Sequence, residues 1–198
     1  TNTPYGKDVL KMLSDACHEE GMGLSIYYSV PDWHHPHAYN PVSSHQWLAV
    51  DKEHGNFEIY KQYIKDQITE LLTGYGPIYT LFWDIPPKID DPSFNDLVRK
   101  LQPGIFINDR GFGLGDFSTP EKRIPREGYP GRDWEACMTV GNRWGYHCED
   151  HANYKSPETV ILQLQECAAK GGNLLLNIGP KADGSIPEGI AEVFKRVG

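Results

Sequence analysis

The sequence predicts an α/β fold built on parallel strands, and two observations support this prediction. Short apolar runs typical of buried strands alternate along the chain with amphipathic stretches typical of helices. Continuous apolar strands separated by helices indicate β/α units whose sheet is covered on both faces. The second observation is that strand after strand ends in a polar residue, as the carboxyl edge of a functional parallel sheet does.

The first half of the chain contains three helix–strand steps. The first helix has Val9, Leu10, Leu13, Ala16 and Cys17 on one face, with Gly21 as its C-cap. A long loop rich in Pro, His and Trp precedes the second helix. The expected elements are a helix from Asp8 to about Glu20, a strand over 24–29, a helix from about Glu53 to Leu72, a strand over 78–84, a short helix opened by Pro92 and a strand over 105–109.

The second half continues the alternation after another long loop. Ser156 and Pro157 form an N-cap followed by proline at the first helical position. Gly171 and Gly172 end that helix. The expected elements are a weaker strand over 136–141, the helix after Ser156, a clear strand over 173–180 and a final helix from about Pro187.

The polar strand ends make the carboxyl edge the predicted site. They are Ser29 followed by Asp32, then Asp84, Asp109 with Arg110, and Asn177. No GxGxxG or GxxxxGK[ST] motif follows any strand, which removes the main support for a nucleotide-binding sheet. We found no internal repeat and no linker, so residues 1–198 are expected to form one domain. An open doubly wound sheet and a (β/α) barrel both remain compatible with the pattern.

Composition excludes several classes of partner. A net charge of -8 argues against nucleic acid, which requires clustered Lys and Arg. No apolar stretch approaches the roughly 18 residues of a membrane-spanning helix. The four cysteines, Cys17, Cys137, Cys148 and Cys167, form no CxxC pair and are expected to be buried free thiols. The first residues resemble the middle of a protein, so the sequence predicts no localisation.

Asp84 is the leading candidate for a reactive group. It closes the apolar run IYTLFWD, and no helix starts directly after it, which weakens the alternative role of a capping carboxylate. A carboxylate beside Phe82 and Trp83 is partly desolvated and requires donors to stay ionised. Arg110, at the end of the next strand, can supply them.

Two later segments offer partners for this carboxylate. Residues 107–121 contain Asp109, Arg110, Asp116 and Glu121 on a glycine-bearing loop, and a long ordered loop is usually functional. A second carboxylate near Asp84 would complete the pair that glycoside hydrolysis requires. Residues 134–146 add Glu135 and Trp144, with a surface charge and an aromatic loop residue as the simpler alternatives.

Three histidines, His34, His35 and His37, lie around a proline in the loop after the first strand. Their spacing matches no usual ligand set, and no cysteine or carboxylate completes it. We therefore expect no metal, and loop or subunit-contact histidines instead.

Five segments together resemble the α-L-fucosidases of glycoside hydrolase family 29. They occur in the family's order over about residues 8–190 and read ACHEEGMGLSIYYSVPDW, LFWD, INDRGFGLGDFSTPE, WEACMTVGNRWGY and GGNLLLNIGPKADGSIP. The resemblance implies an incomplete or open parallel (β/α) barrel of the TIM type, with about five of the eight β/α units. It also implies a retaining exo-glycosidase that removes terminal α-L-fucose without a cofactor.

The resemblance assigns roles to matching residues. Asp84 matches the nucleophile, and Glu121 matches the general acid/base, with Glu135 and Asp116 in reserve. Among the sugar contacts, Tyr27 matches a hydroxyl donor and Arg110 a fucose contact near the nucleophile. Phe82 and Trp144 match the aromatic wall for the fucose methyl group, which leaves Trp83 to pack on the other side of its strand.

Relative to the family, the chain lacks the early strands, with their fucose-binding histidine pair, and the C-terminal β-sandwich. The chain is then either a fragment or a minimal enzyme whose copies form a homo-oligomer that covers the open side of the barrel. In the second case we expect the cluster of His34, His35 and His37 to replace the missing pair, within one chain or across an interface. A non-catalytic fucose-binding module is the alternative function. Neither nucleic acid nor a membrane is an expected partner.

Overall fold

Helices and parallel strands alternate along the chain, as the sequence predicts. The computed structural model describes residues 4–45, 51–149 and 153–198. The chain divides into two compact units, Thr1–Asp116 (unit 1) and Phe117–Gly198 (unit 2). Each unit contains a three-stranded sheet whose paired strands run parallel. The predicted α/β fold with parallel strands is therefore confirmed.

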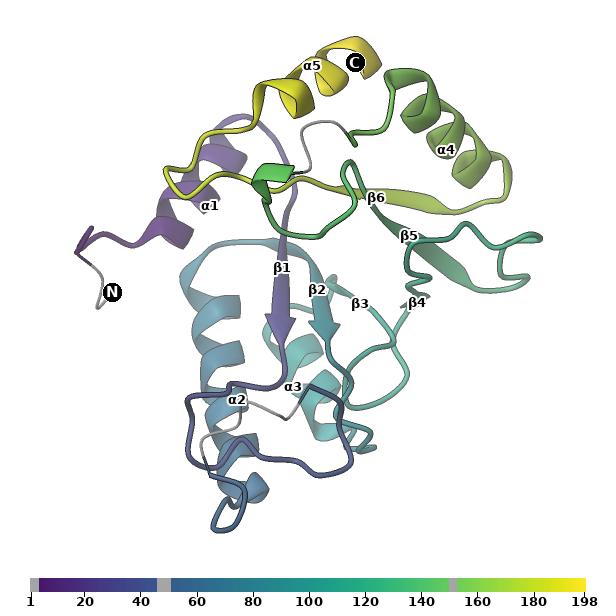
Figure 1. Cartoon of the computed structure of the whole chain (residues 1–198). Helices are drawn as coiled ribbons and strands as arrows, with labels where there is room; N and C mark the ends of the chain where they lie inside the picture. The colour runs from purple at the N-terminus through teal and green to yellow at the C-terminus, as the bar shows by residue number, and fades with distance from the viewer. Residues whose placement is uncertain (1–3, 46–50, 150–152) are drawn as a thin grey trace. The chain divides into compact units, whose positions relative to one another are not determined.

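Unit 1 has its strands in the order β1–β2–β3 (Figure 1). The apolar residues of β1 and β2 and the buried faces of helices α2 and α3 form one core. The elements are α1 (Val9–Glu19), β1 (Leu24–Ser29), α2 (Phe57–Gly74), β2 (Ile78–Asp84), α3 (Ser93–Leu101) and β3 (Phe106–Ile107).

The two faces of the unit 1 sheet differ in cover. Leu24, Ile26 and Tyr28 of β1 are buried, whereas the side chain of Tyr27 is 59% exposed. Successive side chains of a strand point to opposite faces. One face therefore packs on the core with α2 and α3, and the other presents Tyr27. This second face carries the candidate site described below.

Unit 2 has its strands in the order β4–β5–β6 (Figure 1). On one face of β5, Trp134, Ala136 and Met138 pack with Cys167 of α4. Alternation places Glu135 on the opposite face. The elements are β4 (Phe117–Ser118), β5 (Asp133–Thr139), α4 (Pro157–Ala169), β6 (Asn173–Asn177) and α5 (Glu188–Val197).

Several elements differ from the prediction: β5 begins three residues earlier than the expected strand over 136–141, and β6 ends at Asn177 rather than at residue 180. Helix α2 begins at Phe57, because the side chain of Asn56 caps it by accepting the amide of Glu58. Strand β3 contains only Phe106–Ile107, since the chain leaves the sheet at once. The sequence missed β4, whose two residues are too few to show a period of alternation.

The predicted apolar face of α1 is only partly covered. Cys17 packs against the unit 1 core, but Val9 and Leu13 are 61% and 53% exposed. All four cysteines are free, as expected, but only Cys137 and Cys167 are buried: Cys17 is partly exposed and Cys148 is exposed. Among the described residues, no helix is both long and apolar enough to cross a membrane.

Candidate active site around Asp84

Asp84 lies at the carboxyl end of β2, where its backbone pairs with Ser29 of β1. Its carbonyl oxygen accepts the amide of Val30 at 3.0 Å, so the strand end is anchored to the neighbouring chain. The side chain is 23% exposed, so part of the carboxylate stays in contact with solvent. The polar strand end that the sequence indicated is therefore a partly desolvated carboxylate with a fixed backbone.

Two side chains donate to the two carboxylate oxygens of Asp84. The hydroxyl of Tyr27 donates to Oδ2 at 2.7 Å, and Nη1 of Arg110 donates to Oδ1 at 2.9 Å. Burial by itself would raise the pKa of Asp84, but these donors and the Ile85 amide outweigh it and lower that pKa. The arrangement stabilises an ionised carboxylate, as the position of Arg110 in the sequence led us to expect.

The same two donors have apolar support from Phe82. The rings of Tyr27 and Phe82 stack with centroids 6.1 Å apart, and the Arg110 guanidinium lies 5.4 Å from the Phe82 centroid. Burial, followed by the bond to Asp84, raises the pKa of Tyr27, so its hydroxyl keeps its proton. Unit 1 thus brings together four of the predicted site residues.

Trp83 lies on the opposite face of β2, as the sequence predicted. It is fully buried, and its indole Nε1 donates to Oδ1 of Asn95 at 3.2 Å. Its ring meets Phe94 and Phe112 edge-on. Trp83 therefore belongs to the core, and only Phe82 of this aromatic pair faces the carboxylate side.

The residue after Asp84 has a strained backbone. Ile85 has a φ of 58°, in the left-handed region that a β-branched side chain rarely adopts. Such strain persists only where the surrounding structure imposes it, and it occurs often at functional sites. Here it accompanies a sharp turn directly after the carboxylate.

The histidines of the following loop have different surroundings. His34 is exposed and lines a hollow that also includes Tyr27 and Ile85. His35 instead packs against helix α2, with its ring centroid 5.0 Å from that of Tyr60 and 4.5 Å from that of Tyr63 and the rings tilted to one another. The described residues contain no group of three or more His, Cys, Asp or Glu arranged to hold a metal.

Glu121 lies in unit 2 on a segment that bridges to β5. It forms an isolated parallel bridge with Cys137, and its side chain is exposed. Its neighbour Lys122 has a φ of 53°, another left-handed non-glycine residue. The amide of Lys122 donates to the Cys137 carbonyl at 2.9 Å, which fixes the segment against the sheet.

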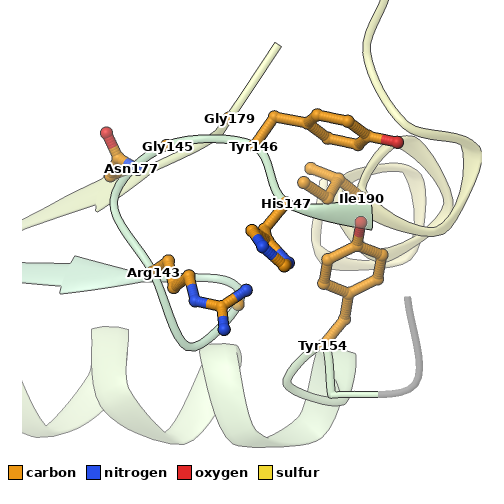
Figure 2. A pocket seen from close by; sticks show the side chains of 9 residues that line it. Arg143, Gly145, Tyr146, His147, Tyr154, Asn177, Gly179 and Ile190 are labelled. Carbon is orange, nitrogen blue, oxygen red and sulfur yellow. The ribbon is translucent and has the colours of Figure 1, made fainter. Parts of the chain in front are cut away.

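Trp144 lies on the loop after β5 and is 36% exposed. Nζ of Lys122 lies 5.5 Å from its ring centroid, and Asn177 donates to its carbonyl oxygen at 2.6 Å. Figure 2 shows the pocket that this loop lines, with Arg143, His147 and Tyr154 among the residues around it. Its free space of about 10 Å³ is room for roughly one water, so it is no sugar site.

The two reserve carboxylates have defined partners. Oε2 of Glu135 accepts from Asn173 at 2.7 Å across the β5–β6 pair. Burial raises the pKa of Glu135, which the bond from Asn173 only partly opposes. Asp116, in unit 1, pairs with Arg99 at 2.6 Å and accepts the amide of Ile107 at 2.8 Å, so it braces β3 against α3.

One residue of the site was missed by sequence reasoning. Asn108 is fully buried, and its side-chain amide forms hydrogen bonds with both backbone groups of Trp83. Asn108 directly follows β3 in the run IFIND, and a polar residue at a strand end was the signal that could have identified it. The roles of Glu121, Glu135, Trp144, His34 and His35 toward a substrate stay predictions.

Comparison with known proteins agrees with the resemblance read from the sequence. A family model described as Alpha-L-fucosidase matches residues 1–198. Plasma alpha-L-fucosidase of Rattus norvegicus is 31% identical over 209 residues, covering 97% of this chain and 43% of the rat protein. The chain therefore spans less than half the length of that relative.

Solved structures show the same similarity. Alpha-L-fucosidase isoenzyme 1 from Paenibacillus thiaminolyticus aligns with a TM-score of 0.88 and 34% identity, covering all 100% of this chain and 52% of its own. An alpha-L-fucosidase from Bacteroides thetaiotaomicron, trapped as a covalent intermediate in complex with 2-fluoro-fucosyl fluoride, aligns with a TM-score of 0.84 and 28% identity. That alignment covers 99% of this chain and 50% of the other.

Replacing Arg110 by methionine is expected to raise the pKa of Asp84, because the variant keeps an apolar side chain over Phe82 and loses the charged donor. Carbon-13 NMR titration of the Asp84 carboxyl carbon measures this. The pKa of Asp84 is lower in the folded than in the unfolded protein. The Asp84 carboxylate therefore stabilises the fold above the unfolded pKa, and this stabilisation is lost as pH falls through the folded pKa. Urea unfolding of the variant should therefore depend less on pH in that acidic range.

The control is Arg99→Met, which removes a guanidinium–carboxylate pair at another place in unit 1, the pair of Arg99 with Asp116. It should leave the titration of Asp84 unchanged. An Asp84 midpoint that is identical in the wild type and in folded Arg110→Met would contradict the electrostatic account.

Proposed function

The chain belongs to the alpha-L-fucosidase family, and we propose that it hydrolyses terminal α-L-fucosyl linkages with retention of configuration. The observation that carries the proposal is the Asp84 carboxylate, which Tyr27 and Arg110 keep ionised at the open end of a parallel sheet. An ionised, oriented and partly desolvated carboxylate is what a glycosidase nucleophile requires. The proposed substrate is a fucosylated glycan or glycoside.

In the first step Asp84 attacks the anomeric carbon, and the bond to the leaving oxygen breaks as a general acid protonates that oxygen. In the second step the residue that acted as the general acid, now deprotonated, acts as a base and takes a proton from water. That water attacks the fucosyl–Asp84 ester and releases fucose. We assign the acid/base role to Glu121, which lies on a segment fixed by its bridge to β5. Glu135 is the reserve candidate with physical support, since a raised pKa suits a proton donor.

The proposed sugar contacts combine donors with an aromatic wall. The Tyr27 hydroxyl gives its one hydrogen to Asp84 and can still accept from a sugar hydroxyl through a lone pair, whereas the Arg110 guanidinium carries five N–H donors; Phe82 supports both side chains. Phe82 and Trp144 are proposed to contact the fucose methyl group, which other hexoses replace by a hydroxymethyl. We retain His34 and His35 as proposed binding residues. His34 has the better support, since it shares a hollow with Tyr27.

We further propose that residues 1–198 are one part of a (β/α) barrel of the TIM type. Both units supply parallel strands followed by helices, as that architecture requires. A non-catalytic fucose-binding module is the second candidate, because the chain spans 43% of its rat relative and turnover requires a second carboxylate to act with Asp84. Both candidates use the same contacts to fucose and differ only in turnover.

Hydrolysis of p-nitrophenyl α-L-fucoside tests the proposal. We expect turnover by the wild type and its loss in Asp84→Gly, which removes the nucleophile but leaves space for a small anion. Sodium azide should restore cleavage of that variant and yield β-L-fucosyl azide, because azide attacks from the side that the carboxylate occupied. Proton NMR of the product identifies the anomer.

A variant of the acid/base residue is recognised by an azide product of the opposite anomeric configuration to the product of Asp84→Gly. In Glu121→Ala we expect kcat to fall about 10²–10⁴-fold. Azide should then react with the fucosyl–enzyme intermediate to give α-L-fucosyl azide. The matched variants Glu135→Gln and Asp116→Asn should keep turnover without forming that product. α-L-fucosyl azide from Glu135→Gln would transfer the role to Glu135, and wild type that binds L-fucose in calorimetry without turnover would favour the binding module.

We also propose that copies of the chain associate, because apolar side chains of α1 are exposed, among them Val9 and Leu13. Analytical ultracentrifugation should show a homo-oligomer that dissociates in the double variant Val9→Lys and Leu13→Lys. Leu114→Lys is the control, since Leu114 is 81% exposed on a different segment of unit 1. A wild type that sediments as a monomer at every concentration would contradict this part of the proposal.

A further inference from the structure

Asn108 is a fully buried polar residue beside the Asp84–Arg110 pair. Its Oδ1 accepts the amide of Trp83 at 2.8 Å, and its Nδ2 donates to the Trp83 carbonyl at 2.8 Å. A side-chain amide is one of few groups that can accept and donate in the same plane. Both hydrogen-bonding groups of one buried residue in β2 are therefore satisfied by a single side chain.

This arrangement replaces a missing piece of the sheet. The ladder between β2 and β3 pairs Thr80 with Phe106 and Leu81 with Ile107. Trp83 lies beyond that ladder, where a longer β3 would have supplied backbone partners. Because the amide of Asn108 supplies them instead, the main chain can leave the sheet after Ile107 without leaving buried polar groups unpaired.

The departure of the chain determines where Arg110 lies. The Trp83 carbonyl belongs to the peptide that joins Trp83 to Asp84, so Asn108 holds the backbone that carries the carboxylate. Asn108 also begins the turn that carries Arg110, two residues later. One buried amide therefore connects the backbones of both members of the ion pair.

A second contact with Trp83 closes the turn on the other side of Arg110. A Cβ atom on Gly111 would lie 2.4 Å from Cδ1 of the Trp83 indole, so the main chain at Gly111 passes directly against that ring. The indole itself is fixed by its bond to Asn95. Arg110 thus lies between two residues that both rest on Trp83.

We propose that Asn108 is a positioning residue: through Trp83 and the close contact at Gly111, it holds the Arg110 guanidinium in register with the Asp84 carboxylate. The consequence for catalysis rests on the proposed function. The geometric consequence, a correctly placed charge beside Asp84, does not depend on turnover.

The test compares variants of the two contacts with matched controls. Asn108→Leu has nearly the same shape and removes both hydrogen bonds. Gly111→Ala keeps Asn108 and forces the turn away from the indole. The controls are Asn40→Leu, a buried Asn bonded to the carbonyl of Pro87, and Gly104→Ala, where a Cβ meets nothing within 4 Å.

Carbon-13 NMR titration of Asp84 is the decisive readout, because a loss of stability alone would not move it. We expect the Asp84 midpoint to shift upward toward that of Arg110→Met in Asn108→Leu and in Gly111→Ala, and to stay at the wild-type value in both controls. If the wild type hydrolyses p-nitrophenyl α-L-fucoside, kcat/KM should fall about 10²-fold in the two variants, as for a reacting group displaced by about 1 Å.

An inactive wild type would overturn the proposed function and leave the titration test intact. If Asn108→Leu fails to fold, Gly111→Ala decides alone. A folded Gly111→Ala or Asn108→Leu in which Asp84 titrates as in the wild type would overturn the positioning role.

Discussion

The rest of the site depends on the cost of holding Asp84 ionised in a partly buried position. Water is largely replaced by protein there, and the charge would be unfavourable without compensation. Tyr27 and Arg110 provide that compensation with one hydrogen bond to each carboxylate oxygen. Each neighbouring feature of unit 1 serves this pair of contacts: Phe82 supports the two donors, and the backbone of β2 holds the carboxylate end still.

The parallel sheet explains why these groups meet. Tyr27 comes from β1, Asp84 from β2 and Arg110 from the turn after β3, and all three lie toward the carboxyl ends of adjacent parallel strands. Because successive side chains of a strand point to opposite faces, the adjacent residues Phe82 and Trp83 lie on different faces of the sheet. Phe82 faces the carboxylate side, and Trp83 anchors the core that the turn after β3 rests on. The layer behind the site is thus a packed hydrophobic core rather than a loop.

Most of the unit 1 site was predictable from the sequence. The strand ends indicated Asp84 and Arg110. The resemblance added Tyr27 and the role of Phe82, which left Trp83 for the opposite side of the strand. The role of Asn108 was not predictable, because it depends on which backbone groups of a neighbouring strand lack a partner, and that follows from how far β3 extends. The packing of His35 against α2 depends in the same way on the path of a long loop, which local sequence does not determine.

The proposed function requires Asp84 to act as an ionised nucleophile toward fucose. Mass spectrometry after incubation with 2-deoxy-2-fluoro-L-fucosyl fluoride tests this role most directly, because the fluorine slows hydrolysis of the intermediate more than its formation when the leaving group is fluoride. The protein should gain the mass of one fluorofucosyl group, located by peptide sequencing on Asp84. A protein that stays unlabelled, or a label on another carboxylate such as Glu121 or Glu135, would contradict this role.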